Sequence, residues 1–114
     1  MSIDRLFKDQ VRFTDKIIND LSVNVSKTEL IKEYLLSLHD ELSEILHCTN
    51  WKWHREDYGS DIDYENLYVE LIDTQKFLWG LMHICGMDIN KFEEVYDKKS
   101  KIVEERLMKL KGKQ

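Results

Sequence analysis

Residues 64–84 read YENLYVELIDTQKFLWGLMHI, and this stretch decides the fold. Its apolar side chains recur at the three- and four-residue intervals that place them on one helix face, which predicts a helix from Tyr64 to about Ile84. Asp63, directly before it, is a residue type that caps a first turn, and Gly86 suits the left-handed position that ends a helix. The stretch therefore predicts a complete helix with a defined start and end.

Three more helices are predicted on the two sides of this stretch, because apolar residues recur there with the same period. They run from Ile3 to about Leu21, from Ser26 to about Leu46, and from Ile89 to about Lys109. Ser26 and Glu29 form a capping box at the start of the second helix, and Asp88 can cap the last one. On the first helix, Leu6 and Phe13 belong to the predicted apolar side.

The glycine and proline content supports an all-α chain. There is no proline, and there are four glycines in 114 residues, so residues that break helices are nearly absent. Residues 48–63 are the one longer connection, and they hold Trp51, Trp53 and Tyr58 among polar residues. The length suits one domain, residues 1–114, with a small core that association between chains would help to stabilise. The sequence predicts an all-α four-helix bundle that forms oligomers.

The charge and the cysteines restrict the class of protein. A net charge of -5 leaves no excess of Lys and Arg to neutralise phosphates, so no nucleic-acid partner is expected. Cys48 and Cys85 lie outside any CxxC arrangement and are expected to be buried free thiols in a reducing, cytoplasmic compartment. Residues 1–20 are charged and periodic, unlike a signal peptide, and the apolar run 77–87 is too short to span a bilayer. No membrane association is expected.

Two carboxylate pairs interrupt the apolar pattern: Glu41 with Glu44, and Glu70 with Asp73. Each pair has i,i+3 spacing, which puts both side chains on one helix face, roughly one turn apart. Acids in an apolar setting cost free energy unless a cation meets them. A site of carboxylates without histidine selects a hard cation such as Mg²⁺ or Mn²⁺ over zinc. The pairs therefore predict a metal site between two helices.

Two other interpretations of the pairs stay open. An E-x-x-E pair is common on the solvated face of a helix, and Glu41 with Glu44 fits that description. A di-iron site would need Glu-x-x-His motifs on its helices. Glu44 and His47 match that motif, but Asp73 takes the place of the histidine after Glu70, so half of the required set is present.

The order of these residues resembles the all-α nucleoside triphosphate pyrophosphatases, the superfamily of MazG-like enzymes and dimeric dUTPases. Residues 64–77 look like the E-N-x-x-x-E-x-x-D-x-x-x-F segment of the dimeric dUTPases, and Trp51 with Lys52 resembles their W-K motif. Residues 85–88 and 96–99 resemble the C-G-(L/M) turn and the Y-x-x-K motif of the same branch. The resemblance covers nearly the whole chain.

The resemblance implies a Mg²⁺-dependent hydrolase that converts a nucleoside triphosphate, with dUTP as the candidate, into the monophosphate and pyrophosphate. It implies that the four carboxylates hold Mg²⁺ and that Glu44, helped by Glu41, orients or deprotonates the attacking water. It assigns binding of the substrate to Gln10, Trp51, Lys52, Asn66, Tyr96, Lys99 and Arg106. It further implies a homodimer or a dimer of dimers, and a role in nucleotide-pool sanitation.

The chain also departs from that family. Gln75 and Lys76 stand where the family often has Trp-His, and Val103 stands where the dimeric dUTPases have Asn. The insertion that those enzymes carry between core helices is absent, so the base remains open. Two rival functions remain open as well: a nucleotide-binding or regulatory module of the same fold without turnover, and a plain helical interaction protein whose acids are solvated.

Overall fold

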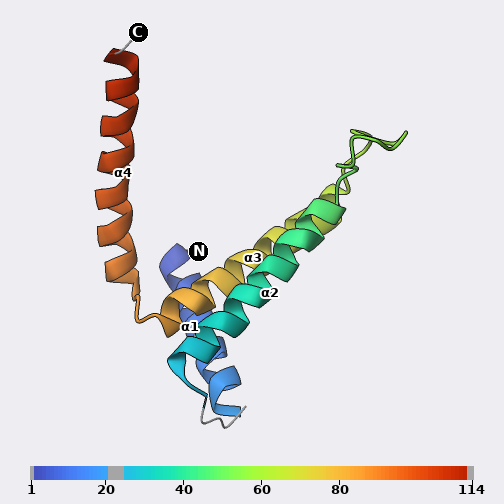
Figure 1. Ribbon diagram of the computed structural model, residues 1–114. Helices are drawn as coiled ribbons and strands as arrows, with labels where there is room; N and C mark the ends of the chain where they lie inside the picture. The colour runs from blue at the N-terminus through green and yellow to red at the C-terminus, as the bar shows by residue number, and fades with distance from the viewer. Residues whose placement is uncertain (1, 21–24, 113–114) are drawn as a thin grey trace.

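The structure, a computed structural model, describes residues 2–20 and 25–112. Within them it contains four α-helices and no strand (Figure 1). The helices are α1 (Ile3–Asp20), α2 (Lys27–His47), α3 (Tyr64–Ile84) and α4 (Ile89–Gly112). The all-α prediction is confirmed, while Leu21, the predicted end of the first helix, lies outside the described residues. None of the described helices combines the length and the apolar character that a bilayer crossing requires.

Side chains fix the starts of α2 and α3 as the sequence predicts. The Ser26 hydroxyl accepts a hydrogen bond from the backbone amide of Glu29, with 3.2 Å between oxygen and nitrogen. A carboxylate oxygen of Asp63 accepts one from the amide of Asn66 at 3.3 Å. Each bond satisfies one of the amides that the first turn of a helix leaves without a partner.

The turn from α3 to α4 is a Schellman motif. Gly86 has φ 83°, the left-handed conformation that suits glycine. Its N–H donates to the carbonyl of His83, and the N–H of Met87 donates to the carbonyl of Met82, both at 2.9 Å. Asp88 then accepts a bond from an amide in the first turn of α4 at 2.8 Å. The direction in which α4 leaves α3 is therefore set by a defined turn.

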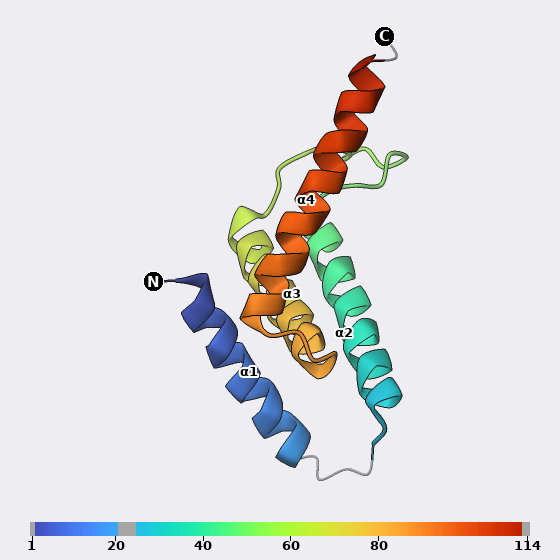
Figure 2. The ribbon, with the colours of Figure 1, turned by 90° about the vertical axis from the view of Figure 1, so that its left-hand side faces the viewer.

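The packed body consists of α1, α2 and α3. Helices α2 and α3 lie side by side as an antiparallel hairpin, and α1 packs against α3 (Figures 1 and 2). The three helices come close together at Gly80 on α3, where a Cβ atom would lie 2.7 Å from Cε2 of Tyr34 and 3.0 Å from Oγ1 of Thr14. Nearby, Nε2 of His83 lies 2.7 Å from Oδ1 of Asp15, which joins α3 to α1.

The buried face of α1 differs from the predicted one. Phe7, Gln10 and Thr14 are the buried residues of this helix, whereas Phe13 is 54% exposed. The prediction that Phe13 faces the core is therefore wrong. The reason is the close contact with Gly80 and Tyr34, which requires the small side chain of Thr14 at the contact and turns the neighbouring position outward.

Helix α4 does not pack along the other three helices. It leaves the end of α3 and projects away from the hairpin, so that the two form the arms of a V (Figure 1). The radius of gyration is 18.3 Å, whereas a compact chain of this length would have roughly 13 Å. The predicted four-helix bundle is thus only partly formed within one chain. The apolar pattern of α4 indicates a helix that packs against a partner, but it does not indicate whether that partner belongs to the same chain.

Candidate metal centre

Three carboxylates from two helices meet inside the hairpin. Glu41 comes from α2, and Glu70 and Asp73 come from successive turns of α3. Each offers one oxygen atom, and these three atoms all lie within 4.8 Å of one another. All three residues are half-buried. The expected meeting of the two acidic pairs therefore takes place with three of the four carboxylates, and we call Glu41, Glu70 and Asp73 the carboxylate cluster.

Glu41 is the member whose charge is hardest to accommodate. The pKa of Glu41 is raised to about 7, first because its carboxyl group is removed from water, and further by the nearby charges of Glu70, Asp73 and Asp40. Its Oε2 atom is buried and has no hydrogen-bond partner among the described residues. A cation in the cluster would offset the negative charge that raises the pKa of Glu41, and it would take the unpartnered Oε2 atom as a ligand.

The donor atoms of the cluster suit a hard divalent cation. All three donors are carboxylate oxygens, with no imidazole or thiolate in the group. Magnesium prefers oxygen ligands and keeps several of its waters, so three carboxylates and an open side are a sufficient protein contribution. Zinc would favour nitrogen or sulfur ligands. The donor atoms are therefore compatible with Mg²⁺ or Mn²⁺, and the bound cation stays a prediction.

Glu44, the fourth predicted ligand, lies outside the carboxylate cluster. It is one turn further along α2 than Glu41, and it is exposed. Its backbone carbonyl accepts a bond from Sγ of Cys48 at 3.4 Å. Glu44 is near enough in sequence to share the helix face of Glu41, but its role as a ligand or base stays a prediction.

A cavity adjoins the cluster at Asp73. Its volume is about 250 Å³, and it lies between α1, α2 and α3. The lining residues are Gln10, Phe13, Ile17, Tyr34, Asp73, Lys76 and Phe77. Gln10, one of the predicted substrate-binding residues, is buried, and its Nε2 lies 3.4 Å from the hydroxyl of Thr14. The structure thus brings Gln10 to the same cavity as one member of the carboxylate cluster.

Three predicted substrate residues lie at the far end of the hairpin. Trp51 and Lys52 belong to the loop between α2 and α3, with the Lys52 ammonium 5.7 Å from the centre of the Trp51 ring. They line a separate cavity of about 160 Å³. Asn66 lies in the first turn of α3, where its side-chain amide already donates a hydrogen bond to Asp63 at 2.6 Å. The structure does not bring these three residues to the Gln10 cavity.

The predicted substrate-binding residues of α4 are also separate from the cluster. Tyr96 is 64% exposed and stacks on Phe92 with 6.2 Å between the ring centres. Lys99 lines a cavity between α4 and the end of α3, and Arg106 is exposed further along α4. Because α4 projects from the body, none of these residues lines the cavity beside Asp73.

The two cysteines are free, as predicted, but they are not both buried. Cys85 is exposed, so the expectation of burial is wrong for it. The reason is its position as the C-cap of α3, where the chain turns away from the body. Cys48 is half-buried, and loss of water raises the pKa of its thiol, an effect to which the charges of Asp63, Glu70 and Glu44 add.

Sequence reasoning missed Tyr34, Phe13 and Lys76 as possible site residues. Burial raises the pKa of Tyr34, against a smaller opposing effect of the Thr14 hydroxyl. The ammonium of Lys76 lies 5.8 Å from the centre of the Phe13 ring. Spacing could have found two of them: Tyr34 lies seven residues before the cluster residue of α2, and Lys76 lies three residues after Asp73, so each shares a helix face with a predicted ligand. Nothing in the spacing pointed to Phe13.

Comparison of this chain with models of known protein families, with curated proteins and with solved structures finds no match.

Proposed function

We propose that this protein hydrolyses a nucleoside triphosphate to the monophosphate and pyrophosphate, with Mg²⁺ held by Glu41, Glu70 and Asp73. The observation that carries the proposal is the meeting of these three carboxylates beside a cavity that Asp73 also lines. A magnesium–nucleotide complex needs oxygen ligands for the cation and, next to them, a concave site for the nucleoside.

The side chains around the cluster have separate tasks in this proposal. Bound Mg²⁺ would offset the charge of the phosphate oxygens. Glu44 is exposed and lies one turn from Glu41 on α2, and in this proposal it would orient the attacking water and accept its proton. Lys76 lies one turn from Asp73, where its ammonium would bind phosphate oxygens as a charged hydrogen-bond donor.

The cavity offers contacts that suit a nucleoside. The Gln10 amide provides one donor and one acceptor group for the edge of a base. Phe13 and Phe77 provide aromatic rings against which a flat base can stack. We propose a deoxynucleoside triphosphate such as dUTP as the substrate, and nucleotide-pool sanitation as the role of the reaction.

The first test measures pyrophosphate release from a panel of ribo- and deoxynucleoside triphosphates, with Mg²⁺ and with a chelator. We expect release from at least one nucleotide, dependent on Mg²⁺. Glu70→Gln should lower the rate by more than about 100-fold, because the substitution removes a charged ligand. Glu65→Gln, an exposed acid on the same helix outside the carboxylate cluster, is the matched control and should leave the rate unchanged.

The second test separates turnover from binding. Mg²⁺ should raise the melting temperature of the wild-type protein by binding linkage, equivalent to about 2.7 kcal/mol at a concentration of about 100 times Kd. Asp73→Asn should abolish this rise. A rise with Mg²⁺ and nucleotide but without pyrophosphate release would assign a binding module. No rise at all, together with full activity of Glu70→Gln, would show that the carboxylate cluster is not the site.

A further inference from the structure

Helix α4 carries a seam of four apolar and two basic side chains, most of which its own chain leaves exposed. The residues of the seam repeat at the alternating three- and four-residue intervals of a coiled coil. The α4 seam consists of Phe92, Tyr96, Lys99, Val103, Arg106 and Leu110. Tyr96 is 64% exposed, Val103 is 43% exposed and Leu110 is 63% exposed. Such a repeat on a projecting helix is typical of a helix that packs against a partner.

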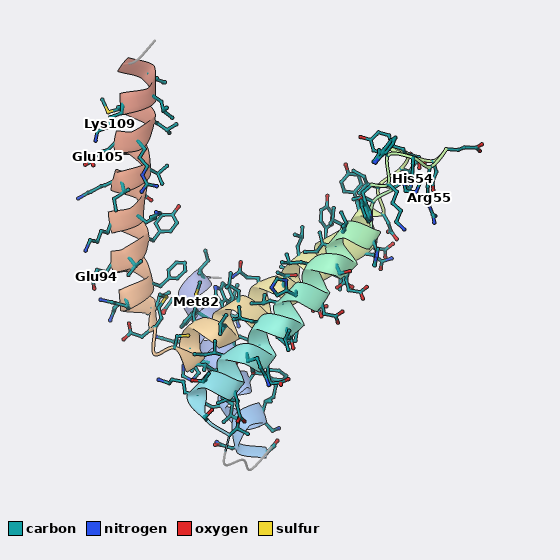
Figure 3. All side chains as sticks on the ribbon, viewed as in Figure 1. His54, Arg55, Met82, Glu94, Glu105 and Lys109 are labelled. Atoms are coloured by element: carbon teal, nitrogen blue, oxygen red, sulfur yellow. The ribbon has the colours of Figure 1, made fainter. Side chains whose placement is uncertain are left out.

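The α4 seam faces the inside of the V. Met82, near the end of α3, lines one cavity together with Phe92, Tyr96 and Val103 of the seam, and this cavity has a volume of about 490 Å³. Figure 3 shows Met82 where the two arms meet, and it shows Glu94 on the outer side of α4, away from the hairpin. The apolar side of α4 is therefore turned toward the opening between the arms.

The other arm of the V carries a second seam with the same spacing. The α3 seam consists of Tyr64, Tyr68, Leu71, Gln75, Leu78 and Met82. Helical periodicity places all six on the face of α3 to which Met82 belongs. Tyr64 is 54% exposed, Tyr68 is 61% exposed and Leu71 is 46% exposed, and these three lie furthest from α4. Both arms of the V thus expose a heptad seam on the side that faces the other arm.

The exposed area of the chain is far larger than a monomer of its size has. The accessible surface is 9417 Å², whereas a folded monomer of this mass exposes roughly 6,600 Å². Among the described residues, Phe7 and Ile84 are the only large hydrophobic side chains that are buried. The excess of roughly 2,800 Å² is slightly above the roughly 1,000 to 2,500 Å² per chain that most obligate homodimers bury, so it is large enough for a stable dimer interface.

The charges indicate what the α4 seam meets. Helix α4 holds seven Lys and Arg against five Asp and Glu, while the hairpin, residues 27–84, holds five against twelve. Lys99 and Arg106 lie within the seam itself. Two α4 helices packed against each other would bring these like charges together, whereas the acidic hairpin of another copy would offer them opposite charge. Charge complementarity therefore favours α3, and not a second α4, as the surface that receives the seam.

We propose that two copies of this chain interlock, with the α4 seam of each copy lying along the α3 seam of the other. A two-fold axis makes the two contacts identical and closes the assembly at a dimer. The Schellman turn at Gly86 and the Asp88 cap hold α4 away from the α3 of its own chain, which leaves the V open for the second copy. The two seams, the exposed area and the charges of α4 are all independent of the metal site.

The first experiment measures the molar mass of the full chain by sedimentation over a range of concentrations. The wild type should have twice the mass of one chain. Leu110→Asp should raise the dissociation constant by roughly 100-fold or more, because symmetry puts the unpaired carboxylate into both halves of the interface. Met108→Asp is the matched control, since Met108 is 72% exposed on the same helix but lies off the seam. It should leave the dimer unchanged.

The same comparison can be made on α3. Leu71→Asp should give monomers, while Val69→Asp, at a neighbouring exposed position off the seam, should remain dimeric. Both positions of each pair are solvent-exposed in the single chain, so circular dichroism should show the same helix content for all four variants. If a seam variant loses helix content, the Val103→Lys variant replaces it as the test. Val103→Lys should be monomeric and should keep the helix content of the wild type.

A mixing experiment identifies which helices pair. Leu71→Asp and Val103→Lys chains should each be monomeric alone. Mixed, they should form a heterodimer, because one of its two contacts is fully wild type and the other places Asp in the same seam as Lys. Pairing between two α4 helices predicts no such rescue. A wild-type monomer with the extended scattering profile, a compact monomer whose α4 folds onto its own α3, or a dimer insensitive to Leu110→Asp would each overturn the proposal.

Discussion

At the scale of single residues, Glu41 should make the stability of the metal-free protein depend on pH. Its pKa is about 7 in the folded protein, whereas an unfolded glutamate titrates at about 4.3. The unfolded chain therefore releases this proton first, and the stabilising contribution present below about pH 4.3 is lost as the pH rises through 7. We expect the melting temperature of the wild type to fall over this window.

Glu41→Gln isolates this effect from the other titrating groups. The variant should lack the fall between the two pKa values, and at pH 8 without Mg²⁺ it should melt a few degrees above the wild type. Saturating Mg²⁺ should reverse the order, because the cation stabilises the charged carboxylate of the wild type and finds a weaker ligand in the variant. Identical pH profiles for the two proteins would contradict the assignment of a strained carboxylate at Glu41.

Gly80 is the second residue with a sharp prediction. A Cβ there would come within 2.7 Å of the Tyr34 ring and 3.0 Å of the fully buried Thr14 hydroxyl. Gly80→Ala should therefore destabilise the protein by about 1 to 3 kcal/mol in urea unfolding, despite the higher helix propensity of alanine. Gly112→Ala is the control, because nothing lies within 4 Å of its added Cβ. Equal stability of the two variants would show that α1 and α2 can move away from α3 at this contact at little cost.

The sequence predicts the chemistry of a single residue better than it predicts which residues surround that residue in the fold. Glu70 and Asp73 could be singled out because polar side chains are rare in the apolar stretch around them. The small Thr14 at the contact with Gly80 could not be foreseen, since its burial depends on how two helices cross and not on the pattern within one. The same holds for Lys76, whose place in the Asp73 cavity depends on where α1 lies.

At the scale of elements, Asp63 fixes the helix that carries two of the three cluster carboxylates. It accepts bonds from the backbone amide of Asn66 at 3.3 Å and from its side-chain amide at 2.6 Å. Asp63→Ala should destabilise the protein by about 1 kcal/mol, measured by thermal or urea unfolding. Asp63→Asn should recover most of this loss, because asparagine also caps helices. A large loss in Asp63→Asn as well would point to a role for the charge and not for the cap.

The helix bounds could be predicted closely because the signals for them are local. The caps at Ser26, Asp63 and Asp88 and the left-handed turn at Gly86 act within a few residues of each helix end. Each depends on hydrogen bonds that the sequence itself specifies. The packing of α4 depends on a surface distant in sequence, and no local signal identifies it.

At the scale of the whole molecule, the seams and the area explain why a chain with ordinary composition has so small a core. A hydrophobic fraction of 42% is enough for a compact domain, yet about half of the large apolar side chains in the described residues are exposed and only Phe7 and Ile84 are buried. The sequence pattern indicates which faces need cover. It does not distinguish cover within the chain from cover by a second copy, because the two require the same residues.

If two copies bury each other's seams in a dimer, the stability of the protein should depend on its concentration. Folding and association are then one equilibrium, so raising the concentration from about 5 µM to about 200 µM should favour the folded dimer by about 2 kcal/mol. For a dimer of this size, that corresponds to a rise in melting temperature of roughly 4 to 8 °C, measurable by calorimetry. Leu110→Asp should melt at a lower temperature that does not change with concentration, whereas Met108→Asp should follow the wild type. A wild-type melting temperature that is constant over this range would mean that each chain stabilises itself, and the exposed seams on α3 and α4 would then need another explanation.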